Sequence, residues 1–175
     1  MRNIFFFIAA FIFLLGCGGD NKQKLNKLTY INDCESLDGW DNNNRLLSTE
    51  NFHSGRYSNI LNTNNNYSIT FSKKYGDISK KKLKGVKVSC WAYFLTNNFK
   101  GKVLVLNLDS AEKKVFYNQT FMDKFVKSPR TWTKIEEEIP LSRKFGPNTI
   151  FGFYAWSTSD DTILVDDLCI EFIED

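Results

Sequence analysis

The most constraining feature of this sequence is an alternation of apolar and polar residues, which recurs in short runs from residue 28 onward. Clusters of Asn, Gly, Asp and Ser separate the runs, and none keeps a helical period over a dozen residues. A period of two with turn-forming residues between runs is typical of antiparallel β-structure. We therefore expect strands over residues 28–31, 46–48, 57–62, 67–71, 86–95, 102–109, 114–121, 133–139, 149–157 and 163–173.

The same alternation divides several expected strands into a core face and an outward face. In 86–95 an apolar set should face the core, which leaves Trp91 and Tyr93 outward. In 149–157, Tyr154 and Trp156 likewise share one side, although both sides of that strand are apolar. We therefore predict an all-β, two-sheet jelly-roll β-sandwich in which the strands of the two aromatic pairs could share a sheet. The expected core sets are Val88, Cys90, Ala92 and Phe94; Leu104, Leu106 and Leu108; and Phe151, Phe153 and Ala155.

The chain begins with the pattern of an export signal. Residues 4–15 are uncharged and almost wholly apolar, and they follow a basic residue at Arg2. About a dozen apolar residues are fewer than the roughly 20 that a membrane-spanning helix needs. The segment ends at Gly16 and Cys17, which resembles the bacterial lipobox, so Cys17 is the expected lipidation site. The alternative is an ordinary signal peptide that happens to contain this cysteine.

Three regions are therefore expected: a lipoprotein signal peptide over 1–16, a flexible tether over 17–27 and one β-sandwich domain over 28–175. Asp20, soon after the cysteine, resembles the pattern of Bacteroidetes-type lipoproteins displayed on the outer face. We expect an outer membrane lipoprotein, at the cell surface or facing the periplasm, that is bound to the membrane through its N-terminal lipid. The 23 basic and 20 acidic residues nearly balance, which argues against a nucleic-acid partner.

Four segments in order, 32–40, 53–58, 86–93 and 165–168, resemble jelly-roll carbohydrate-binding modules and their galactose-binding-like relatives. The resemblance implies non-catalytic carbohydrate binding and a structural calcium ion. Its implied ligands are the side chains of Glu35 and Asp166 and the backbone carbonyls of Ser54 and Arg56. The alternative is that the carboxylates cap turns or pair with lysines.

The resemblance also implies that Cys34 and Cys169 are close in space, as a candidate disulfide in an oxidising compartment. Cys90 would then be a buried free thiol. The alternative is that all three thiols stay unpaired and act as small apolar residues.

The outward aromatic residues of the strands 86–95 and 149–157 have the flat, amphipathic side chains that stack on sugar rings. They are Trp91, Tyr93, Tyr154 and Trp156. We expect them to form an outward platform that binds a polysaccharide or oligosaccharide. The alternative is that they are ordinary β-sheet residues covered by a loop or a second layer. Trp40 and Trp132 are expected to pack at sheet edges. The predicted ligand-binding residues are Trp91, Tyr93, Tyr154 and Trp156.

An enzyme is a competing class of protein. Glycoside hydrolysis needs two carboxyl groups at a defined separation, and the sequence indicates no such pair. It also contains no nucleophile-elbow triad, His-rich metal site or Gly-rich phosphate loop, and His53 is expected in a turn without a catalytic role. We therefore expect that this protein is not an enzyme. A protein-binding adhesin or assembly subunit that uses the same β-sandwich face is the other alternative.

Overall fold

The structure is a computed structural model that describes residues 28–37, 39–41, 47–111 and 113–175. The expected signal peptide, the tether and Cys17 lie outside these residues. Within the described ranges, no helix is long and apolar enough to cross a membrane.

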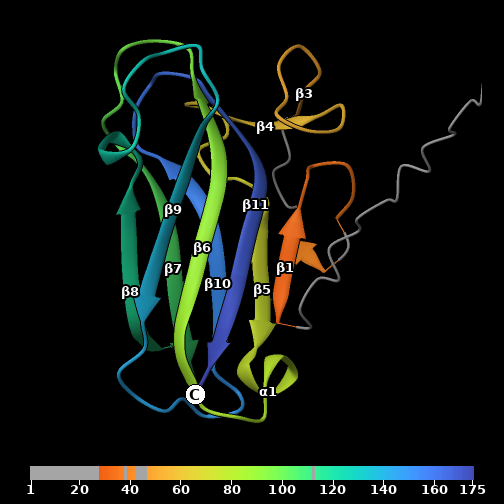
Figure 1. Cartoon of the computed structure of the whole chain (residues 1–175), viewed down its shortest axis with the longest axis vertical. Coiled ribbons are helices and arrows are strands. Elements are labelled where there is room, and N and C mark those ends of the chain that lie inside the picture. The colour runs from red at the N-terminus through yellow and green to blue at the C-terminus, as the bar shows by residue number, and fades with distance from the viewer. Residues whose placement is uncertain (1–27, 38, 42–46, 112) are drawn as a thin grey trace, which may run out of the picture.

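Two antiparallel sheets pack face to face as a β-sandwich (Figure 1). The sequence prediction of an all-β, two-sheet jelly roll is confirmed. Two short helical turns, α1 (Tyr75–Ile78) and η1 (Met122–Lys124), lie between strands. Sheet A contains β1 (Thr29–Asn32), β3 (Leu47–Ser48), β4 (Ser58–Leu61), β6 (Leu83–Phe94), β9 (Thr133–Pro140) and β11 (Ile163–Glu174). Sheet B contains β2 (Trp40–Asp41), β5 (Thr70–Lys74), β7 (Lys102–Ser110), β8 (Lys113–Phe121) and β10 (Ile150–Ser157).

The strand order differs from the order along the chain. Sheet A runs β3-β4-β11-β6-β9, and β1 pairs with the last part of β11. Sheet B runs β2-β5-β10-β7-β8. In Figure 1, β9, β6 and β11 form the front layer, and β8, β7, β10 and β5 form the layer behind it. The last strand of the chain, β11, therefore lies inside sheet A, between β4 and β6.

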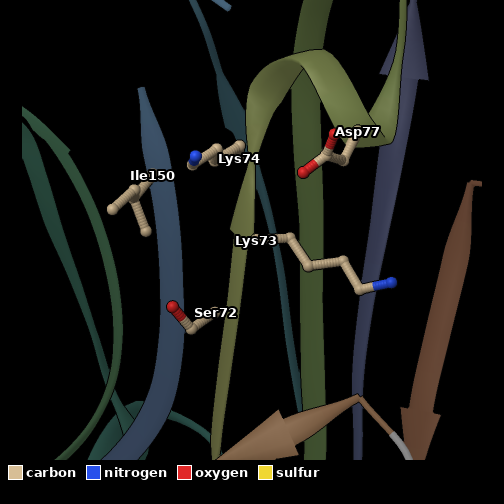
Figure 2. A pocket seen from close by; sticks show the side chains of 5 residues that line it. All are labelled: Ser72, Lys73, Lys74, Asp77 and Ile150. Atoms are coloured by element: carbon tan, nitrogen blue, oxygen red, sulfur yellow. The ribbon is translucent and has the colours of Figure 1, made fainter. Parts of the chain in front are cut away.

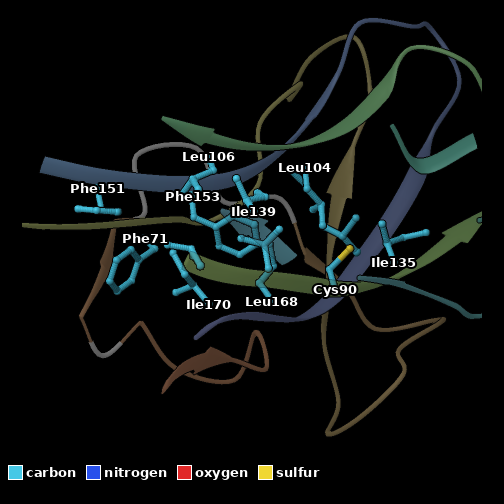
Figure 3. Packing of buried hydrophobic residues seen from close by; sticks show 14 of the residues in the cluster. Phe71, Cys90, Leu104, Leu106, Ile135, Ile139, Phe151, Phe153, Leu168 and Ile170 are labelled. Carbon is cyan, nitrogen blue, oxygen red and sulfur yellow. The ribbon is translucent and has the colours of Figure 1, made fainter. Parts of the chain in front are cut away.

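The core lies between the two layers, as Figure 3 shows. All the inward residues that alternation predicted on β6, β7 and β10 are buried there. Phe172 of β11 joins the two sheets, because its ring lies 5.9 Å from that of Phe71 on β5 and 5.3 Å from that of Phe151 on β10, measured between centroids. A continuous apolar layer of this kind is the main stabilising contribution to a β-sandwich.

Strand β5 begins later than expected for a local reason. The segment expected at 67–71 becomes a strand only at Thr70, because Ser68 bonds twice to Ala155 and interrupts the regular ladder before it. The two-residue strand β2 was not predicted. Its Trp40 is 8% exposed and packs edge-on against Phe71 at 5.5 Å, which agrees with the prediction that Trp40 packs at a sheet edge.

The prediction that the two aromatic pairs could share a sheet is wrong. Trp91 and Tyr93 are on β6, which pairs with β11 and β9 in sheet A. Tyr154 and Trp156 are on β10, which pairs with β5 and β7 in sheet B. Each pair does alternate with core residues, but the outward sides of two packed sheets face opposite directions. The four residues therefore do not form a single platform.

Cys34 and Cys169 are not joined by a disulfide. Cys34 is fully buried in the core, where its Sγ lies 3.9 Å from the carbonyl oxygen of Val165. Cys169 alternates with the buried Leu168 and Ile170, so it lies on the outward side of sheet A. The two cysteines thus belong to opposite sides of one sheet. Cys90 is a buried free thiol as predicted, and burial raises its pKa.

Candidate functional site

The outward side of β5, β10, β7 and β8, which we call the sheet B face, carries most of the exposed aromatic side chains. Strand register sets its rows: Trp156 lies beside Val103, and Val103 lies beside Phe121 on the next strand. Two residues further along each ladder, Tyr154, Val105 and Gln119 form the next row. Side chains two residues apart on neighbouring strands come together on one face of a sheet.

Five aromatic residues on this face form what we call the aromatic platform: Tyr67, Tyr117, Phe121, Tyr154 and Trp156. Tyr67, Tyr117 and Phe121 are 42%, 40% and 43% exposed, and Tyr154 and Trp156 are half-buried. The rings of Tyr67 and Trp156 are nearly parallel, 4° apart in orientation with centroids 6.1 Å apart, and Tyr67 also contacts Tyr154 at 5.6 Å. Exposed aromatic rings that lie together on one face make this surface a candidate ligand-binding site.

Polar groups are interspersed with these rings. Burial first, and then the neighbouring Tyr117 and Tyr67, raise the pKa of Tyr154 to about 12. Its hydroxyl is protonated at neutral pH, as in any tyrosine, and can donate a hydrogen bond. The indole Nε1 of Trp156 is buried, and no described residue pairs with it. Such unpaired polar atoms are uncommon in folded proteins and are satisfied by water or by a ligand.

A shallow pocket of about 330 Å³ lies at the end of the sheet B face opposite the Trp156 row (Figure 2). Ser72, Lys74 and Ile150 line it from the face itself, while the side chain of Lys73 extends from the other side of β5. Asp77 of α1 completes the lining. The sheet B face thus has an aromatic end and a polar end.

Trp91 and Tyr93, the other pair predicted to bind a ligand, lie on the outward side of sheet A in a different environment. The imidazole of His53 stacks on Trp91, with ring centroids 3.8 Å apart and planes 13° apart. Trp132 contacts both His53 and Tyr93, at 5.8 and 5.4 Å. A loop therefore covers one face of Trp91, as the alternative interpretation of the sequence anticipated. Both Trp91 and Tyr93 are half-buried.

The four residues predicted to bind calcium meet around the loop 53–57. There the two carboxylates accept hydrogen bonds from backbone N–H groups of the loop. Asp166 Oδ2 accepts hydrogen bonds from the backbone N–H of His53 at 2.8 Å and of Ser54 at 3.1 Å. Glu35 Oε1 accepts from the backbone N–H of Arg56 at 2.7 Å and of Tyr57 at 2.9 Å. This donor set does not by itself fit a cation, which needs oxygen ligands such as the carbonyls of Ser54 and Arg56.

A β-bulge explains why two consecutive carboxylates reach the same loop. The register of β11 against β6 shifts after Asp166, and Asp167 has a φ of 46°. Asp167 binds the Nδ1 of His53 and the hydroxyl of Ser54, each at 2.6 Å. Among the described residues, no three His, Cys, Asp or Glu side chains converge as a metal site. Calcium at Glu35 and Asp166 stays a prediction.

Similarity to known proteins is found at the level of structure. No protein-family model matches the chain, and no curated protein matches it either. The CBM22-2 xylan-binding domain of Paenibacillus barcinonensis Xyn10C is 14% identical, with 84% of this chain and 99% of that chain covered and a TM-score of 0.56. The C-terminal family 22 carbohydrate-binding module of Clostridium thermocellum Xyn10B is 12% identical, with 82% and 91% covered and a TM-score of 0.54.

A further xylan-binding domain from the same family is 13% identical, with 82% of this chain and 93% of that chain covered and a TM-score of 0.52. At these identities the likeness concerns the fold. The chain therefore has a two-sheet antiparallel β-sandwich that resembles family 22 carbohydrate-binding modules.

Sequence reasoning found Tyr154 and Trp156 but missed the other three members of the aromatic platform. Tyr117 and Phe121 could have been found, because with Gln119 they occupy one side of a strand with a period of two. Tyr67 could not, because it lies outside the regular strands and reaches the platform through an isolated bridge to Trp156.

Proposed function

We propose that this protein binds a polysaccharide or oligosaccharide, without cleaving it, on the aromatic platform of the sheet B face. The observation that carries this proposal is the grouping of Tyr67, Tyr117 and Phe121, each at least 40% exposed, around Tyr154 and Trp156. Flat aromatic side chains stack on the apolar face of a sugar ring, and nearby polar groups orient its hydroxyls. The resemblance to carbohydrate-binding modules supports the same proposal at the level of the fold.

The distribution of acidic residues supports binding without catalysis. Within the described strands β5, β7, β8 and β10, Asp109 is the single acidic side chain on the sheet B face. Retaining and inverting glycosidases need two carboxyl groups on either side of the scissile bond. One carboxylate suits recognition of hydroxyls rather than hydrolysis.

Binding to a glycan array, followed by calorimetry with the glycans that bind, tests this proposal. We expect dissociation constants in the micromolar to millimolar range, about −4 to −8 kcal/mol, which is typical of shallow sites. Trp156→Ala should weaken binding by at least about tenfold, because a buried aromatic anchor contributes about 2 kcal/mol or more. Trp91→Ala is the matched control on sheet A and should leave the affinity unchanged.

Comparison of Trp91→Ala with Trp156→Ala also shows which of the two sheets binds the ligand. Loss of affinity in Trp91→Ala but not in Trp156→Ala would place the ligand on sheet A instead. No glycan binding at all would leave a protein-binding adhesin or assembly subunit as the better description of the same face.

We also propose that the protein is a lipoprotein of the outer membrane, attached through acylated Cys17. The apolar segment before Gly16 and the polar segment after Cys17 support this proposal. Two or more acyl chains on one residue give a stable anchor, since each buried methylene contributes about 0.8 kcal/mol. Mass spectrometry of membrane-extracted protein should find acylated Cys17 at the N-terminus, and Cys17→Ala should remove the protein from membranes. An unmodified N-terminus at another residue would contradict the proposal.

A further inference from the structure

The centre of the sheet B face contains a glycine where its neighbours carry large side chains. Gly152 of β10 lies between Ser72 of β5 and Asn107 of β7 in the strand register. A Cβ at this position would lie only 2.3 Å from Oδ1 of Asn107. The amide of Asn107 therefore occupies the space directly above Gly152, which a larger side chain could enter only if the amide moved.

The position of this amide fixes a carboxylate beside it. The Nδ2 of Asn107 donates a hydrogen bond of 2.5 Å to Oδ2 of Asp109, two residues along the same strand. The Oδ1 of Asn107 is buried against Gly152 and has no hydrogen-bond partner among the described residues. Asn107 thus lies between the glycine and the carboxylate, and its hydrogen bond orients Asp109.

Asp109 borders both ends of the face. It lies beside Ile150, which lines the polar pocket, and its charge contributes to the raised pKa of Tyr154 in the aromatic platform. A carboxylate is an acceptor only, and its two oxygens can accept from two donors at once. Neighbouring hydroxyls of one sugar ring are such a pair of donors.

We infer that Asp109 binds two adjacent free hydroxyls of an uncharged sugar ring that stacks on the platform, and that Asn107 is the residue that positions this carboxylate. The inference rests on the proposed function and adds the ligand's chemical class, a neutral chain of rings with unsubstituted neighbouring hydroxyls. Hydrogen bonds to a charged acceptor are about twice as strong as neutral ones, so this contact selects among ligands that stack equally well.

Calorimetry of the full chain with xylohexaose and cellohexaose, two neutral chains of this class, tests the inference. Asp109→Asn should weaken binding by at least about tenfold, which is the loss expected for a hydrogen bond to a charged group. The matched control is Asp160→Asn, an exposed aspartate in the turn before β11, which should bind like the wild type. Melting curves should show that both variants are folded.

A double-mutant cycle separates positioning from a general structural role. Asn107→Ala should weaken binding in the wild type but should have no further effect when Asp109→Asn is already present. Additive losses, or unchanged affinity in Asp109→Asn, would overturn the inference. So would a wild-type protein that binds polygalacturonate but neither neutral chain, while leaving the proposed function in place. Absence of binding to every glycan would instead overturn the proposed function itself.

Discussion

Phe172→Ala should lower the free energy of unfolding by about 3–5 kcal/mol, measured by urea denaturation. The side chain of Phe172 is 1% exposed and contacts Phe71 and Phe151 of sheet B from its place on β11 of sheet A. Removal of the ring leaves a cavity where the two sheets meet. Rings on both sides would then lose contacts that the close-packed surroundings cannot restore by small shifts.

Phe121→Ala is the matched control, because it makes the same chemical change at a position that is 43% exposed. It should cost less than about 1 kcal/mol of stability. It should also weaken glycan binding, since Phe121 is part of the aromatic platform. Similar stability losses in the two variants would contradict the description of Phe172 as the contact that joins the sheets.

Asp166→Ala should lower the free energy of unfolding by about 2–3 kcal/mol, because it leaves three partly buried backbone N–H groups without their acceptor. Asp166 is fully buried and accepts hydrogen bonds from the backbone N–H of His53, Ser54 and Asp167. Asp160→Ala, at an exposed aspartate, is the control and should change stability by less than about 0.5 kcal/mol. Equal losses in the two variants would show that Asp166 does not hold the loop.

The stability that Asp166 contributes should depend on pH, and with a chelator present the direction follows from its pKa. Burial raises the pKa of Asp166 to about 6, from its ordinary value of 3.8. The folded state then binds the proton more tightly than the unfolded chain does. The part of the stability that depends on the ionisation of Asp166 is therefore greatest below about pH 4 and declines as the pH rises through 6, while the hydrogen bonds from the loop remain.

A calcium ion at Glu35 and Asp166 would change this result. A bound ion favours the charged carboxylate and stabilises the native state by mass action. The calcium prediction therefore requires a lower melting temperature in chelator, restored by calcium, with no such difference in Asp166→Ala. Identical melting curves with and without chelator would show that hydrogen bonds alone hold the loop.

Alternation alone predicted which way the side chains of β6, β7 and β10 point, because that property depends only on neighbouring residues. It could not predict which strands share a sheet. The pairing of β10 with β5 and β7 depends on contacts between segments that are far apart in the chain. For this reason, Tyr154 and Trp156 were correctly described as outward but were wrongly grouped with Trp91 and Tyr93.

The sequence could not predict that His53 would be the residue that stacks on Trp91. His53 reaches Trp91 because the bulge in β11 turns both Asp166 and Asp167 toward the loop 53–57. A bulge with a positive φ at an aspartate has no distinct pattern in the sequence, since two consecutive aspartates are also common in turns. The structure was needed to show that this loop covers one face of Trp91.

The central place of β11 in sheet A determines the order in which the sandwich can assemble. The strand pairs with β4, β6 and β1, yet it consists of twelve residues at the end of the chain. β4 and β6 therefore acquire the strand that connects them only after β7, β8, β9 and β10 have been synthesised. Contacts between segments so distant in sequence form slowly, so we expect the completion of sheet A to limit the rate of folding.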